Sequence, residues 1–146
     1  MAKEVLEKAE WISKFSDSFQ NDLVKLMMPF DAPEGHVFIT EGDPIDSFLL
    51  VETGTLLRTK HQADGNGEPI KIDEIHPVRC TGFLHVAGNA DPEVAFATIT
   101  AGKGGAKVWV VPGGHFRKMC EGNPKHSSEV IEVSEYCHIA TTLYII

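Results

Sequence analysis

The stretch GHVFITEGDPIDSFLLVETGTLL, residues 35–57, decides the fold that we predict for this chain. Residues 37–39 are valine, phenylalanine and isoleucine, which favour a strand, and the Gly-Asp-Pro at 42–44 is typical of a tight turn. A short apolar run follows at 48–51, and Gly54 interrupts it before a second run begins. Short strands joined by such compact turns are typical of a small antiparallel roll or barrel.

Composition indicates one globular domain over residues 1–146, because 42% of the residues are hydrophobic and 23% are charged. The formal net charge is -8, and the only arginines are Arg58, Arg79 and Arg117. A nucleic-acid surface needs clustered Lys and Arg, so we expect no nucleic-acid partner.

The three cysteines, Cys80, Cys120 and Cys137, are widely spaced and form no CxxC pair, which predicts reduced thiols rather than a disulfide framework or a zinc knuckle. The N-terminus is charged and has no apolar signal core, and no run reaches the length of a membrane span. We therefore expect a cytoplasmic location and no membrane insertion.

Hydrophobic periodicity divides the chain into N-terminal helices (1–29), a β-roll (33–111) and C-terminal helices (113–146). A helix is predicted over 2–15, and a second helix is capped by residues 16–18 and ended by Pro29. The predicted strands are 36–40, 47–51, 55–61, 69–75, 78–81, 95–101 and 106–111.

Two glycine-rich segments predict hairpins, at 64–67 and at 102–105. A short helix is expected over 113–121, ended by Gly122. A longer helix then begins at Pro124, capped by Asn123.

Two groups of residues in the roll carry a family signature. The first group is Pro33-Glu34-Gly35, Gly42-Asp43, Asp46, Phe48, Val51 and Gly54, and the second is Gly82 with Ala97-Thr98-Ile99-Thr100-Ala101. In this order they resemble the signatures of the cyclic nucleotide-binding domain family. The resemblance implies a mainly antiparallel β-roll with flanking helices, a regulatory rather than an enzymatic role, and cAMP or cGMP as the ligand.

The chain departs from the family pattern at the two anchoring positions. In the family, a Glu after the glycine binds the ribose 2'-hydroxyl and an Arg before the Ala-Thr pair holds the cyclic phosphate. Phe83 and Ala95 occupy those positions here. Loss of a charge-assisted phosphate contact costs about 2–3 kcal/mol, so the expected affinity for cAMP or cGMP is weak or nil.

The candidate ligand pocket lies around the second signature. Its members are Arg79, Thr81, Gly82, Phe83, Leu84, His85, Val86, Ala97 and Thr98. A helix that begins at Thr81-Gly82 would offer free backbone N–H groups to an anion, and the Thr98 hydroxyl adds a polar group. Arg79 is either a substitute cation or a strand residue that points to solvent, and Phe83 either fills the pocket or stacks on a ligand.

Enzyme motifs are weak. The seven histidines show no metal-ligand spacing, and no GxSxG motif occurs. Pro112-Gly113-Gly114-His115 loosely resembles the second motif of the cupin family, but the first cupin motif is absent. A metal-dependent cupin enzyme is therefore a remote alternative, and we expect no cofactor beyond a cyclic nucleotide or another small anion.

Three hypotheses follow from the sequence. The first is a ligand sensor whose lid is the helix from Pro124, with Ile131, Tyr136 and His138 along it. The second is a pseudo-binding domain, filled by Phe83, that binds a protein partner or forms a homodimer. The third is the cupin enzyme.

Overall fold

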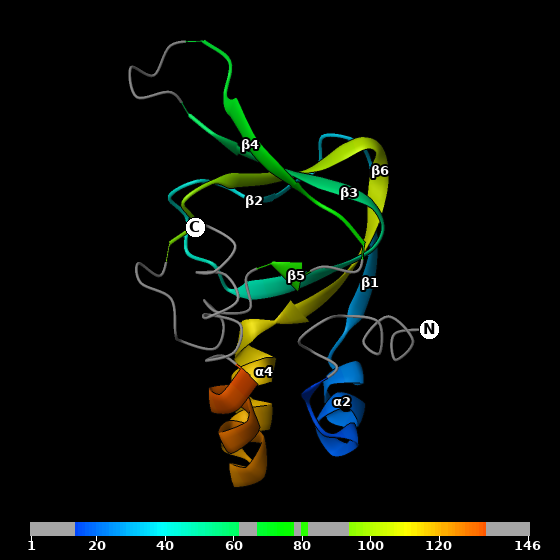
Figure 1. The fold of residues 1–146 in the computed structure, drawn as a ribbon, viewed down its shortest axis with the longest axis vertical. Coiled ribbons are helices and arrows are strands. Elements are labelled where there is room, and N and C mark those ends of the chain that lie inside the picture. The colour runs from blue at the N-terminus through cyan, green and yellow to red at the C-terminus, as the bar shows by residue number, and fades with distance from the viewer. Residues whose placement is uncertain (1–13, 62–66, 78–79, 82–93, 134–146) are drawn as a thin grey trace.

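Two long strands form the frame of the molecule, β3 (Ser47–Lys60) and β6 (Thr98–Pro112). They pair antiparallel from Ser47↔Pro112 to Thr59↔Thr98. In this computed structural model, which describes residues 14–61, 67–77, 80–81 and 94–133, both strands bend sharply (Figure 1). The shorter strands are β1 (Met28–Ala32) and β2 (Val37–Ile39), which pair with β6, and β4 (Ile70–Ile75) and β5 (Cys80–Thr81), which pair with β3. The result is the predicted antiparallel β-roll.

Glycine makes the bend possible where β3 crosses β6. Gly54 has φ +79°, and a Cβ placed on it would lie 2.4 Å from the carbonyl oxygen of Gly105. Gly105 has φ +83°, and a Cβ there would lie 2.5 Å from the carbonyl oxygen of Ala32. Neither position accepts a side chain without a backbone shift, because L-residues with a Cβ avoid positive φ and the space is already filled.

The glycine segment 102–105 does not form the predicted hairpin. It lies inside β6, so the separate strands predicted at 95–101 and 106–111 are one continuous strand from Thr98. The predicted strands 47–51 and 55–61 are likewise one strand, β3, with register shifts on both sides of Gly54. Glycine here supplies bending within a strand rather than a reversal of direction.

The N-terminal boundary of the roll also differs from the prediction. The second helix ends at Val24 rather than at Pro29, and β1 begins at Met28, before the predicted start of the roll at residue 33. The first helix, predicted over 2–15, lies outside the described residues except for 14–15. The hairpin predicted at 64–67 joins β3 to β4, which pair as expected, although residues 62–66 themselves lie outside the described part.

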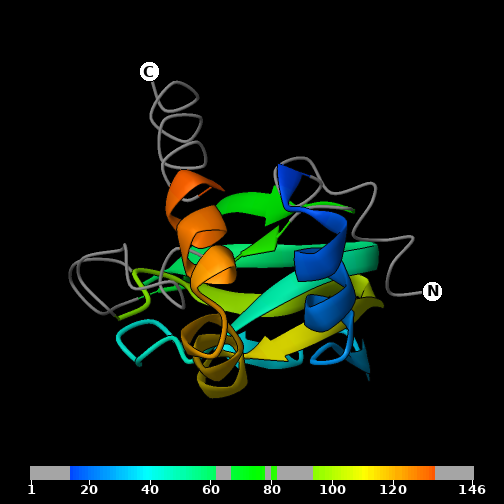
Figure 2. The ribbon, with the colours of Figure 1, turned by 90° about the horizontal axis from the view of Figure 1, so that it is seen from below.

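Helix ends follow the sequence closely. In α2 (Asp17–Val24), the backbone N–H of Phe19 donates to the Ser16 hydroxyl over 3.2 Å, which is the predicted cap. α4 (Gly113–Glu121) has the predicted bounds. The next helix is described over 124–133, and the Asn123 side-chain oxygen accepts from the Lys125 N–H over 3.1 Å. The helices in the described part of the chain all lie on one side of the sheet (Figure 2).

Two clusters of buried side chains pack the molecule. The helix-side core lies between the sheet and the helices and contains Phe15, Phe19, Leu23, Met27, Phe48, Leu50, Trp109, Val111, Phe116, Val130 and Val133. The roll interior contains Ala32, Ile39, Leu49, Val51, Leu56, Ile75, Ala95, Ile99, Ala101, Ala106 and Val108. Adjacent residues of β3 alternate between the two clusters, as the period of two in a strand requires.

A buried histidine joins the terminal helices on the helix side. His126 is 1% exposed, and its Nε2 lies 2.8 Å from the Asp22 carboxylate on α2. Glu129, one turn further, accepts from the backbone N–H of Ser16 over 2.8 Å. The edge of the Phe19 ring packs against His126 with centroids 5.0 Å apart. We call His126, Asp22 and Glu129 the helix clasp.

Candidate functional site

The candidate site surrounds the segment between β5 and β6, and the structure describes its two flanks. On one flank, Thr81 of β5 pairs with Leu49 of β3. On the other, the Ala95 N–H donates to the Asp43 carbonyl over 2.8 Å, and the Gly42 N–H donates to the Ala95 carbonyl over 2.7 Å. The predicted Gly-Asp turn therefore fixes the backbone where the chain re-enters the roll.

Three of the nine predicted site residues are described. Thr81 is half-buried and Ala97 is buried. Thr98 begins β6, and its hydroxyl oxygen accepts from the Glu41 N–H over 3.0 Å, so it already has a structural partner. The other six lie outside the described residues: Arg79, Gly82, Phe83, Leu84, His85 and Val86.

Ala95 stands where the family resemblance implies a phosphate-binding arginine. Its side chain is 4% exposed and belongs to the roll interior. Its two backbone bonds to the Gly-Asp turn hold it in place. A methyl group in these surroundings offers an anion neither charge nor a hydrogen bond.

Glu41 and Lys60, which lie 3.7 Å apart, also bind backbone groups of this region. Glu41 accepts from the His61 N–H over 3.0 Å, and Lys60 donates to the Phe96 carbonyl over 2.8 Å. The His61 N–H, and then the nearby Lys60 ammonium, hold the pKa of the Glu41 carboxyl below its usual value despite partial burial. The Lys60 ammonium also lies 5.7 Å from the centre of the Phe96 ring. This network closes the turn against the end of β3.

The motifs in the sequence did not predict one ion pair, which lies between β3 and β4. The Arg58 Nε donates to the Asp73 carboxylate over 2.9 Å, across the β3–β4 pair. Arg58 is opposite Ile99 of β6 and two residues after Leu56, and both of these are buried in the roll interior. The signal in the sequence is the alternation Leu56, Arg58, Lys60, which places both cations on the interior face of the strand.

No family model matches the sequence, and no curated protein matches it. Solved structures match its fold. One is the N-terminal domain of a transcriptional regulator from Streptomyces coelicolor A3(2), with 20% identity and a TM-score of 0.77, covering 97% of this chain and 95% of that one. Another is a cyclic nucleotide-binding domain from Methylobacillus flagellatus KT, with 20% identity and a TM-score of 0.74, covering 98% of this chain and 76% of that one.

A third is the regulatory domain of Toxoplasma gondii PKA in a co-crystal structure with cAMP, with 18% identity and a TM-score of 0.74. The alignment covers 94% of this chain and 49% of that one, so the chain spans about half of the Toxoplasma protein. The fold is that of a cyclic nucleotide-binding domain. This likeness confirms the predicted fold class and establishes the architecture alone.

Within the cyclic nucleotide-binding fold, the described part of the proposed lid helix begins beside α4. Ile131 is exposed on it, whereas Val130 and Val133 pack into the helix-side core. Tyr136 and His138 lie outside the described residues. The described turns of this helix therefore pack on the helix side, away from Ala95.

The described residues give no support to the cupin interpretation of the Pro-Gly-Gly-His segment at 112–115. His115 is exposed on α4, and the described residues hold no group of three or more His, Cys, Asp or Glu placed to bind a metal ion. Burial, and then the nearby Glu121 carboxylate, raise the pKa of the Cys120 thiol to about 11, which keeps it protonated at neutral pH.

Among the described helices, none has both the length and the apolar character that crossing a membrane requires.

Proposed function

We propose that this chain is a non-enzymatic regulatory domain with the cyclic nucleotide-binding fold and a divergent site that binds cAMP and cGMP weakly or not at all. One observation carries the proposal: a buried alanine, Ala95, occupies the position of the phosphate-binding arginine. The fold supports the regulatory role, because a structure with this architecture is the cAMP-bound regulatory domain from Toxoplasma gondii.

The energetic argument for weak binding is local. A guanidinium that holds a phosphate forms charge-assisted hydrogen bonds, and losing them costs about 2–3 kcal/mol, or about a hundredfold in affinity. The nearby Lys60 ammonium donates to the Phe96 carbonyl and lies 3.7 Å from the Glu41 carboxylate, so it does not replace the missing guanidinium. Phe83, at the position of the ribose-binding glutamate, removes the second anchor.

Thermal unfolding in the presence of cAMP and cGMP tests the proposal. A ligand at a hundred times its Kd adds about 2.7 kcal/mol to the free energy of unfolding. The expected result is therefore an unchanged Tm at micromolar concentrations of either nucleotide. A saturating rise in Tm at those concentrations would overturn the proposal.

A restored site gives the positive control. The double variant Phe83→Glu/Ala95→Arg returns both anchors that the resemblance implies, and it should gain a nucleotide-dependent rise in Tm. Thr100→Arg controls for the added guanidinium alone, because it introduces an arginine on β6 on the face opposite the roll interior. It should leave the response to nucleotide unchanged.

A protein-interaction domain is the second candidate, and exposed apolar side chains on β1 and β2 favour it. Met28, Phe30 and Val37 are exposed. The rings of His36 and Phe38 lie 4.9 Å and 6.0 Å from that of Phe30, so an aromatic cluster sits beside solvent. Sedimentation velocity distinguishes the homodimer form of this candidate, in which the chain sediments as a dimer at micromolar concentration, from a monomeric sensor.

A further inference from the structure

Arg58 follows a buried apolar residue on the interior face of β3 and is one of two cations, with Lys60, at the end of that face. Leu56, two residues earlier on the same face, is fully buried, and the cross-strand neighbour Ile99 is 4% exposed. The Arg58 side chain itself is 27% exposed. Its stem therefore lies against the roll interior while its guanidinium reaches the rim of that interior, as long basic side chains do at an apolar boundary.

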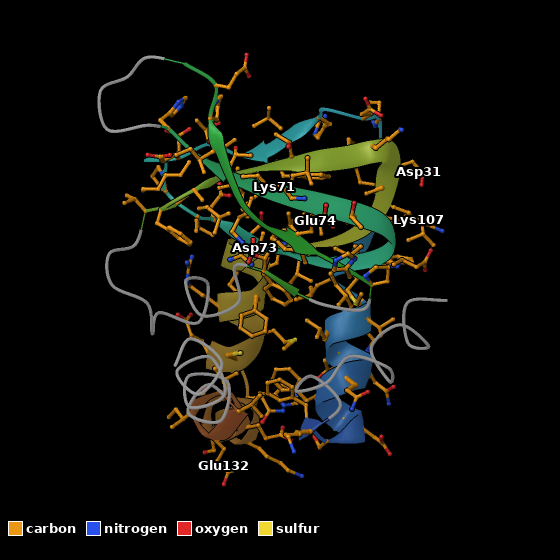
Figure 3. The ribbon with its side chains drawn as sticks, turned by 45° about the horizontal axis from the view of Figure 1, so that its top comes forward. Asp31, Lys71, Asp73, Glu74, Lys107 and Glu132 are labelled. Carbon is orange, nitrogen blue, oxygen red and sulfur yellow. The ribbon has the colours of Figure 1, made fainter. Side chains whose placement is uncertain are left out.

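Asp73 orients this guanidinium. Its carboxylate accepts from the Arg58 Nε over 2.9 Å, and the Asp73 side chain is 48% exposed. Asp73 lies on β4 together with Lys71 and Glu74 (Figure 3). Because the bond uses Nε, the two terminal nitrogens of Arg58 have no hydrogen-bond partner within the described part of the chain. They present a pair of parallel donors.

Several lysines in the described part of the roll have partners of their own. Lys71 pairs with Glu74, and Lys107 pairs with Glu52 over 3.0 Å. Lys60 lies on the same strand face as Arg58, but its ammonium donates to the Phe96 carbonyl. The Lys60 ammonium also lies 3.7 Å from the Glu41 carboxylate, so it does not compete for the contacts of Arg58.

We infer that Arg58 is the anion-binding group of this domain and that its ligand is a small molecule bearing a carboxylate or a phosphate. A planar guanidinium binds either oxyanion through two parallel N–H···O bonds, and a neighbouring carboxylate at Nε fixes its direction. This inference rests on the proposed function, because it names the group that contacts the regulatory ligand.

The test follows the arginine Nε–Hε NMR signals of the ¹⁵N-labelled chain during titration with sodium phosphate and, separately, with sodium succinate at constant ionic strength. The Arg58 signal should shift and saturate with at least one of the two anions, and the anion that saturates it identifies the class of ligand. Arg117, exposed on α4, serves as the internal reference and should not saturate. Shifts that stay linear, or that are equal at the two arginines, would overturn the inference.

Variants make the assignment specific. Arg58→Gln should weaken binding of the saturating anion about tenfold or more, because it removes a charge-assisted pair of hydrogen bonds. Arg58→Lys, which keeps the charge but not the fork, should lie between this variant and wild type. Arg117→Gln makes the same chemical change on α4 and should leave the affinity unchanged. An affinity unaltered by Arg58→Gln contradicts the inference.

The two proposals fail separately. Saturating oxyanion binding at Arg58 combined with a nucleotide-dependent Tm at micromolar cAMP would reject the proposed function and retain the Arg58 site. Flat melting curves with both nucleotides and no saturation at Arg58 would retain the proposed function and reject the site.

Discussion

The two faces of the bent sheet are packed by different kinds of side chain. The helix-side core is built around aromatic rings: Phe48 and Phe116 meet edge to face with centroids 5.5 Å apart, and Phe15 stacks on Phe19 at 3.9 Å. Among the residues that the structure describes, the roll interior has no buried aromatic side chain, and four of its buried members are alanines. Aromatic rings pack between the sheet and the helices, whereas aliphatic side chains line the described part of the face that carries Ala95 and Arg58. The difference separates the part that stabilises the domain from the part that we assign to a ligand.

The largest expected effect compares two neighbouring leucines of β3. Leu50 points into the helix-side core and Leu49 into the roll interior, and both are buried. Truncation of a buried leucine to alanine costs about 2–5 kcal/mol, and the cost is greatest where the surroundings cannot relax. Leu50→Ala, among rigid rings, should lie near the upper limit and Leu49→Ala near the lower limit. Urea unfolding of both variants measures the difference. Equal losses in the free energy of unfolding would contradict the proposed difference between the helix-side core and the roll interior.

The next effect concerns the glycines at the bend of β6, a strand whose side chains contribute to both buried clusters. Gly104 and Gly105 have nearly equal positive φ values, +84° and +83°, but a Cβ on Gly104 meets nothing within 4 Å. Gly104→Ala should therefore cost only the conformational penalty of about 1–2 kcal/mol. Gly105→Ala should cost about 1–3 kcal/mol more, because its Cβ overlaps the Ala32 carbonyl. Chemical denaturation of this matched pair gives the comparison, and a smaller loss for Gly105→Ala would show that the backbone shifts easily there.

The smallest effect is the acid sensitivity of the helix clasp. The hydrogen bond from His126 lowers the pKa of Asp22, and hydrogen bonds from Ser16 lower that of Glu129 although burial opposes this. The unfolded chain then binds more protons than the folded one in acid. The clasp therefore stabilises the fold above the ordinary carboxyl pKa of about 4, and this stability is lost as pH falls through the lower folded value.

Urea midpoints measured between pH 6 and pH 3 test this on the helix side. Asp22→Asn should make the midpoint less dependent on pH, whereas Asp31→Asn, which changes an exposed carboxylate on β1, should reproduce the wild-type slope. An unchanged slope in Asp22→Asn would show that the Asp22 carboxylate contributes nothing to acid sensitivity.

Turn and cap chemistry in the sequence predicted much of the fold. Ser16, Asn123 and Gly122 set helix ends through local hydrogen bonds, and such bonds depend on residues within a few positions. β1 was missed because Met28 to Phe30 are exposed and include a proline, so no alternation marks the strand. The 102–105 error arose because glycine permits both a turn and a bend, and the choice depends on partners far away in sequence, Gly54 and Ala32.

The candidate site was predictable only in part. Family spacing located Ala95, and the structure shows that its side chain is buried. Arg58 lies outside both signatures, and its importance depends on pairing with Ile99 and Asp73, which are 41 and 15 positions away along the chain. Pairwise placement of this kind requires the register of three strands, and a single sequence does not specify that register.

Because Leu49 and Leu50 belong to one strand, β3 contributes side chains to both the roll interior and the helix-side core. A ligand bound at Arg58 that restrains β3 would lower the conformational entropy of the same backbone against which the helices pack. A coupling free energy between two binding sites is the same in both directions. If a ligand at Arg58 changed the affinity of a partner for the helices, that partner would change the affinity at Arg58 by the same factor. Coupling of this kind would require neither a hinge nor a moving lid.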